Sequence, residues 1–192
     1  MHSAIQQFRS NIERVRGLGG LYAALSRLTT PAVDTTDILR AQILLAVSAL
    51  DHYVHEATRL GMIEVFNGTR PSTNAFRRFQ VTIDAAMQGL TSSGGNSWFE
   101  EEIREKHGYL AFQHPDKIAD AIRLFSPCEL WPSIASRFGL SVQDVKNRLQ
   151  LIVERRNKIA HEADLDPSYP GIRWPISHSD AENTVKFIED LC

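Results

Sequence analysis

Several features that define other classes of protein are scarce in this sequence. It has only two cysteines, Cys128 and Cys192, far apart and without CxxC spacing, which is typical of a reducing compartment rather than of a disulfide scaffold. Neither sign of charge dominates, since the net charge is -2, so any surface for nucleic acid must be local. The longest apolar run, "ILLAVSAL", is too short to span a bilayer, and the first residues lack the apolar core of a signal peptide. We therefore expect a soluble, cytoplasmic protein with no membrane partner.

Common catalytic signatures are missing as well. The sequence has no G-x-S-x-G, no P-loop and no G-x-G-x-x-G, so acyl-hydrolase, NTPase and dinucleotide-binding functions have no support. No alternating strand pattern of useful length, internal repeat or low-complexity tract is present. We expect no cofactor.

Helical periodicity is present along nearly the whole chain. The length of 192 residues suits one domain, spanning 1–192. A long helix is predicted from about Thr35 to Gly61, because its apolar residues recur at helical spacing and its opposite face is also apolar between Ala41 and Leu50. These features predict an all-α helical bundle with a long central helix and additional short helices. The apolar residues of the central stripe are Leu39, Ile43, Ala46, Val47, Leu50, Val54 and Ala57.

The remaining helices are predicted from caps and breaks. A first helix covers about Ser3 to Leu28, with an interruption at 17–20 left open, and Ser72 is a plausible cap for a helix that runs through Leu90. The segment "TSSGGNS" is the strongest internal loop signal, and helical pattern resumes in "WFEEEIREKHGYLAF". Short helices are expected in 115–124 and 129–138. Ser141 to Asp144 forms an N-terminal capping signal, and Ser179 or Asp180 can cap a final helix.

The helix predicted over 141–161 carries an arginine on its apolar side. At about 100° per residue, Arg156 falls in the middle of the apolar stripe. A guanidinium cannot be neutralised there, so its burial without an anion is very costly. One interpretation is a structural ion pair with a buried carboxylate, for which Asp51 on the central helix is a candidate. The other is a cation held at a sheltered surface for a phosphate. The apolar stripe consists of Val142, Val145, Leu149, Ile152, Val153, Ile159 and Ala160.

His161 favours the second interpretation. It lies about 140° from Arg156 around a straight helix, so the two groups meet only if the helix ends or bends there. The following "DLDP" cannot continue a helix, and both a helix C-terminus and nearby acidic residues favour a protonated imidazole. Residues 141–161 carry five cations, Arg155 and Lys158 among them, against two carboxylates. Phosphodiester cleavage needs such groups, one to move the 2'-hydroxyl proton and one to hold charge on the phosphorane.

The segment "RNKIAH", residues 156–161, matches the R-x4-6-H motif of HEPN domains in the form with a polar residue directly after the arginine. "LRAQILLAVSALDHYVHEATRLG", followed about a hundred residues later by "VERRNKIAHEADLD", resembles the RiboL-PSP-HEPN group of bacterial HEPN proteins. The resemblance covers the long helix, the motif helix and the closing helix. It gains weight from the all-α context and from the place of the motif at a helix end.

The resemblance implies a metal-independent endoribonuclease, often a toxin or an anti-phage defence effector with an antitoxin or defence-system partner. In such proteins the motifs of two protomers form one composite site. By position, Arg156 stabilises the phosphorane, Asn157 orients the phosphate or the arginine, and His161 is the general acid/base. Arg155 and Lys158 are expected to bind the RNA substrate. Leu151, outside the main stripe, suits a motif helix buried in a homodimer.

Two alternatives remain. The first is a non-catalytic HEPN module that binds a nucleotide, RNA or a protein partner, with Arg156 in a structural ion pair. The second is a metalloenzyme built on "DHYVHE", which matches neither H-E-x-x-H nor H-x-x-E-H and for which we expect no metal. Asp51 and His55 are better interpreted as hydrogen-bonded groups in a polar seam between helices. The family resemblance implies that this helix packs beside the motif helix, so Asp51 and His55 are second-shell candidates for orienting Arg156.

Overall fold

The computed structural model describes residues 1–30, 32–91 and 95–192. Within these ranges its regular structure is helical apart from an isolated β-bridge between Leu165 and Arg173, which confirms the expected all-α fold. None of the described helices is long and apolar enough to cross a membrane. The helices are α1 (His2–Leu28), α2 (Thr36–Phe66), α3 (Asn74–Arg77), α4 (Ile83–Thr91), α5 (Ser97–His107), α6 (Pro115–Arg123), α7 (Leu130–Phe138), α8 (Val142–His161) and α9 (His178–Leu191).

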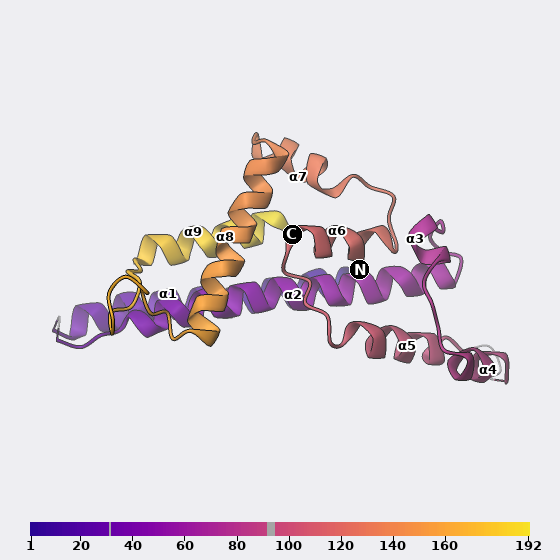
Figure 1. The fold of residues 1–192 in the computed structure, drawn as a ribbon, viewed down its shortest axis with the longest axis horizontal. Helices are drawn as coiled ribbons and strands as arrows, with labels where there is room; N and C mark the ends of the chain where they lie inside the picture. Colours follow the sequence, from indigo (N-terminus) through magenta and orange to yellow (C-terminus); the bar gives the residue numbers. More distant parts are fainter. Residues whose placement is uncertain (31, 92–94) are drawn as a thin grey trace.

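Helix α2 is the centre of the bundle. It runs along the length of the molecule and contacts α1, α5, α6, α8 and α9 (Figure 1). The expected burial of its wide apolar stripe is confirmed, but the helix continues past the predicted end at Gly61. A glycine is needed at this position inside the helix, because a Cβ there would lie 2.3 Å from the ring of Phe125.

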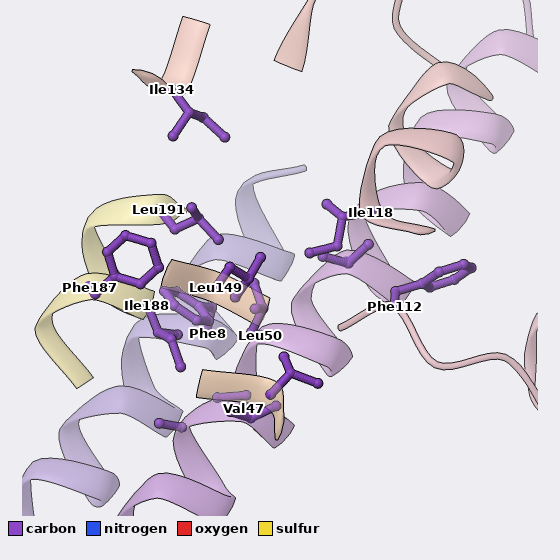
Figure 2. Packing of buried hydrophobic residues seen from close by; sticks show 14 of the residues in the cluster. Phe8, Val47, Leu50, Phe112, Ile118, Ile134, Leu149, Phe187, Ile188 and Leu191 are labelled. Carbon is purple, nitrogen blue, oxygen red and sulfur yellow. The ribbon is translucent and has the colours of Figure 1, made fainter. Parts of the chain in front are cut away.

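The main hydrophobic core lies where α1, α2, α8 and α9 meet. Phe8 of α1, Leu50 of α2 and Leu149 of α8 are almost fully enclosed, and Figure 2 shows them beside Ile188 of α9. Each buried apolar side chain of this size contributes about 1.5–3 kcal/mol relative to exposure. The main core holds α8 as far as Val153, and Ile159 within the motif packs against a second, smaller cluster that includes Leu39 and Ile43 of α2.

Helix α1 is continuous through 17–20, so the interruption considered there is absent. Gly19 lies at a close approach of α9, because a Cβ at this position would be 2.5 Å from the Oε1 atom of Glu182. Gly19 thus serves helix packing rather than a turn, whereas a Cβ at Gly17 or Gly20 would meet no neighbour.

The region 72–107 corrects two predictions. The helix expected from Ser72 through Leu90 is divided into α3 and α4, and Thr73, not Ser72, accepts the capping hydrogen bond from the N–H of Phe76. Between the two helices, the carboxylate of Glu102 on α5 accepts a hydrogen bond from the N–H of Thr82 at 2.8 Å. The next helix, α5, ends at His107, five residues before the end of the expected helical stretch. The centre of the predicted "TSSGGNS" loop, residues 92–94, lies outside the described residues.

Helices α6 and α7 confirm the two short helices, and the cap of α8 is confirmed too, since Ser141 accepts a hydrogen bond from the N–H of Asp144. The cap of α9 was predicted two or three residues too late. Ser177 is the N-cap, and Asp180 completes a capping box by accepting a hydrogen bond from the N–H of Ser177.

Candidate active site at the end of helix α8

Helix α8 stays regular through His161 and ends there, as the sequence predicts. The N–H groups of Glu162 and Asp164 both donate to the carbonyl oxygen of Lys158, at 3.0 Å each. Ala163 and Asp164 then adopt left-handed backbone angles, with φ values of 52° and 58°. These two residues reverse the chain and direct the Asp164 side chain back into the protein.

Asp164 forms a buried ion cluster with two arginines. Its side chain is fully enclosed, and its Oδ2 atom accepts hydrogen bonds from Arg40 Nε at 2.7 Å and from Arg155 Nη2 at 2.8 Å. The carbonyl oxygen of Trp174 accepts from the same two guanidinium groups, at 2.9 Å and 3.3 Å. The cluster joins α2, α8 and the segment before α9, and it provides the anion that buried arginines need.

Arg155 is therefore a paired residue. Burial lowers the pKa of its guanidinium, the Asp164 carboxylate raises that pKa, and the neighbouring Arg40 lowers it again. Arginine stays protonated throughout because its ordinary pKa lies far above neutrality. The role of Arg155 in binding substrate remains a prediction, but its guanidinium already has an anionic partner in the chain, the Asp164 carboxylate that it shares with Arg40.

Arg156 has different surroundings from its neighbour. It is half-buried, its Nη1 atom donates a hydrogen bond to Asn157 Oδ1 at 3.0 Å, and its buried Nε atom has no hydrogen-bond partner among the described residues. No ion pair joins it to any carboxylate in the described part of the chain. A sheltered cation without an anion attracts a phosphate, because partial burial reduces the screening of its charge.

The other residues of the motif lie on the same helix end. Asn157 is half-buried and held by Arg156, whereas His161 is exposed in the last turn. Because α8 stays regular, Arg156 and His161 point about 140° apart around its axis. The helix end alone therefore does not turn the imidazole toward the guanidinium.

Lys158, the second predicted substrate-binding residue, lies against Trp174. Its Nζ atom is 5.1 Å from the centre of the indole ring, a cation–π arrangement. This contact holds Lys158 on the segment that follows the motif, and its role toward RNA stays a prediction.

Asp51 and His55 contact the segment before α6. Asp51 Oδ1 accepts a hydrogen bond from the N–H of Phe112 at 2.6 Å, and His55 Nε2 lies 3.2 Å from the carbonyl oxygen of Leu110. Helix α8 does pack against α2, but within the described ranges neither side chain forms a hydrogen bond or ion pair with Arg156. The structural ion pair considered between Asp51 and Arg156 is absent, and the second-shell role of Asp51 and His55 stays a prediction.

The histidines of α2 were also considered as metal ligands. His52 and His55 line a cavity of about 310 Å³ together with His107 of α5. No group of three His, Cys, Asp or Glu side chains in the described part of the chain has an arrangement that could hold a metal ion. The cavity offers no support for the metalloenzyme alternative.

Sequence reasoning missed the cluster partners Arg40 and Asp164. A signal for Arg40 was present, because an arginine in the apolar pattern of the central helix implies a buried anion. Nothing local identifies Asp164 as that anion, since it lies 124 residues further along the chain.

An all-helical bundle that places an Arg-x4-His sequence at a helix end is the arrangement typical of HEPN domains. A family model described as RiboL-PSP-HEPN matches residues 10–192, and the chain belongs to this family. Comparisons with curated proteins and with solved structures gave no match.

Proposed function

We propose that this chain is a metal-independent endoribonuclease of the HEPN type, with Arg156, Asn157 and His161 as its catalytic set. The observation that carries the proposal is the contrast between the two adjacent arginines. Arg155 is paired with the buried carboxylate of Asp164, whereas Arg156 is sheltered, has no carboxylate partner in the described ranges and retains an unsatisfied Nε donor. A purely structural role for Arg156 would need an anion from the chain itself, and the described residues provide none. A bound phosphate would supply that anion.

The proposed reaction uses the ribose 2'-hydroxyl as nucleophile. An imidazole accepts the 2'-hydroxyl proton, and the 2'-oxygen attacks the adjacent phosphorus. Arg156 donates to the non-bridging oxygens as negative charge develops on the phosphorane, and Asn157 holds the guanidinium in place. The 5'-oxygen leaves with a proton, which gives a 2',3'-cyclic phosphate and a 5'-hydroxyl end.

A homodimer supplies what one chain lacks. Cleavage needs one group to take a proton and another to donate one, and each chain offers one motif histidine. The divergence of Arg156 and His161 on a regular helix also favours a site in which the groups of two protomers are combined. A two-fold contact between motif helices places the same groups of each protomer face to face.

The test is cleavage of RNA by purified protein in the presence of EDTA. We expect cleavage to persist in EDTA and to fall by a factor of about 100 or more in Arg156→Ala and in His161→Ala. An all-deoxy oligonucleotide should stay intact because it lacks the nucleophile. Matched controls are Arg148→Ala, an exposed arginine of the same helix, and His114→Ala, an exposed histidine far along the chain. Both controls should cleave at the normal rate.

Three results contradict the proposal. Ends with a 5'-phosphate and a 3'-hydroxyl rule out attack by the 2'-hydroxyl, and loss of cleavage in EDTA shows dependence on a metal. Folded protein that binds RNA without cleaving it supports the non-catalytic binding module instead.

The biological role that we propose is that of a toxin or an anti-phage defence effector, controlled by an antitoxin or another defence-system protein. Support comes from family membership together with the complete Arg, Asn and His set. Induced expression of the wild-type chain in bacteria should stop growth, and expression of Arg156→Ala should not. Equal growth arrest by both chains contradicts a ribonuclease toxin.

A further inference from the structure

The segment between α8 and α9 is fastened to the beginning of α2. The N–H of Trp174 donates to the carbonyl oxygen of Asp164 at 2.8 Å, and the carbonyl oxygen of Trp174 accepts from Arg40 and Arg155. Arg173 forms ion pairs with Asp34 and Asp37, with its Nη2 atom 2.9 Å from Asp34 Oδ2. The end of the motif helix is thus joined to residues that are distant in the sequence.

The junction itself has an unfavourable backbone. Ala163 and Asp164 are consecutive residues other than glycine with left-handed φ angles. Left-handed angles bring the Cβ atom close to the backbone, and alanine has no polar side chain to compensate. Such angles persist only where surrounding contacts hold them, and they concentrate near functional sites. Two kinds of contact hold this junction: the backbone hydrogen bonds of Asp164 to Lys158 and Trp174, and the side-chain bonds of the Asp164 carboxylate to Arg40 and Arg155.

We infer that Asp164 is a positioning residue for the motif, an inference that rests on the proposed ribonuclease function. By binding Arg155 and Arg40 together, Asp164 fixes the point at which α8 ends and the angle at which His161 leaves the helix. The Asp164 carboxylate is engaged by Arg40 and Arg155, which both donate to its Oδ2 atom, and it forms no ion pair with Arg156. Asp164 contacts no substrate, since its side chain is fully enclosed.

The decisive variant is Asp164→Asn. Asparagine adopts left-handed angles as readily as aspartate and has nearly the same shape, so the substitution removes the charge and keeps the backbone preference. We expect the single-turnover rate of RNA cleavage to fall at least tenfold. The affinity for the same RNA with 2'-O-methyl groups, which cannot react, should change less than threefold. The NMR resonance of the His161 imidazole, assigned by its loss in His161→Ala, should move.

Glu102→Gln is the matched control. Glu102 is a carboxylate that is almost as deeply buried, and it bonds the N–H of Thr82 far from the motif. Measurements are made well below the unfolding temperature of each variant. Glu102→Gln should leave the cleavage rate and the His161 resonance unchanged. If loss of a buried carboxylate lowered activity only by destabilising the protein, this control would lose activity as well.

Arg155→Met is the second variant, and it still tests the inference if Asp164→Asn does not fold. It leaves Asp164 bound to Arg40 and removes the side-chain bond between Asp164 and α8. A positioning role predicts a lower rate at saturating RNA with unchanged affinity for 2'-O-methyl RNA. A substrate-binding role of Arg155 predicts weaker affinity with an unchanged saturated rate, which would overturn the inference.

The failure of this inference is separable from the failure of the proposed function. If the wild-type chain does not cleave RNA, the proposed function fails, while the His161 resonance still decides the positioning role. An unchanged resonance in folded Asp164→Asn, a normal cleavage rate in that variant, or an equal loss in Glu102→Gln overturns the inference.

Discussion

The Nη2 atom of Arg155 lies 2.8 Å from the enclosed Oδ2 atom of Asp164, and the next residue, Arg156, forms no such pair in the described part of the chain. A rotation of about 100° around the helix separates the two side chains. One of them therefore faces the buried carboxylate, whereas the other keeps an uncompensated charge at a half-buried position. This difference separates a structural arginine from the proposed catalytic one.

Arg156→Ala should slow cleavage strongly with little effect on folding. Because no carboxylate of the described residues pairs with Arg156, the substitution leaves no buried acid without a partner, and the free energy of unfolding should change by less than about 1 kcal/mol. The cleavage rate should fall about 10²–10³-fold, as for the loss of one oxyanion-stabilising donor. Urea unfolding and single-turnover kinetics measure the two effects.

The comparison for this prediction is Arg40→Met, which removes one partner of the enclosed Asp164. Breaking a buried ion pair typically costs about 3–5 kcal/mol. Because Arg155 still binds the carboxylate, we expect the free energy of unfolding to fall by slightly less, about 2–4 kcal/mol. A large destabilisation by Arg156→Ala, in step with its loss of activity, would instead favour a structural role for that arginine.

Ala163→Gly should stabilise the protein. The φ angle of Ala163 is 52°, a conformation that costs alanine about 1–2 kcal/mol and glycine very little. The greater freedom of glycine in the unfolded chain offsets part of the gain, so the free energy of unfolding should rise by about 0.5–1 kcal/mol. Ala160→Gly, at an exposed helical position of α8, should lower it by about the same amount. Equal destabilisation by both variants would argue against the left-handed angle.

Leu151→Glu should weaken the proposed homodimer. Leu151 lies on the motif helix with 65% of its surface exposed, and a carboxylate at a contact between two such helices opposes their association. Leu90→Glu on α4, at an even more exposed position, is the control. Sedimentation at micromolar concentration measures the oligomeric state of wild type and of both variants, with and without phosphate. Phosphate should strengthen the wild-type dimer, because it compensates the charges of the two facing Arg156 side chains. A wild-type monomer in both conditions that still cleaves RNA would exclude the composite site.

The stability of the protein should fall as the pH decreases from about 6.5 to 4 because of His107. Burial, together with the nearby His55, lowers the pKa of His107 to about 4. Its ordinary pKa is about 6.5, so within this window the unfolded chain binds the proton and the folded chain does not. The contribution of neutral His107 is fully present above pH 6.5.

His107→Phe should make unfolding less dependent on pH. Urea unfolding at pH 7 and pH 5 should show a loss for wild type that exceeds the loss for His107→Phe by about 1–2 kcal/mol. His114→Gln, at an exposed histidine, should behave like wild type. The same pH dependence in all three proteins would show that His107 titrates normally in the folded state.

The sequence by itself determined the all-helical class, the buried central helix, and the beginning and end of α8. These features depend on contacts within a few residues, namely the apolar stripe of α2, the cap at Ser141 and the helix-breaking residues after His161. The candidate residues of the motif were identified for the same reason, because their order is local. The continuity of α1 and the break between α3 and α4 were not predicted, and both places have tertiary contacts, with α9 at Gly19 and with α5 at Thr82, that no local pattern indicates.

Only the tertiary structure decided which arginine is paired. The sequence indicated a cation, Arg156, on an apolar face and left two interpretations, a phosphate site or an ion pair with Asp51. The buried pair in the structure joins Arg155 to Asp164, and Asp51 binds the N–H of Phe112. The third member of the cluster, Arg40, lies 124 residues from Asp164. A buried charge must find an anion, but the chain's path in three dimensions determines which anion it reaches, and no local pattern records that path.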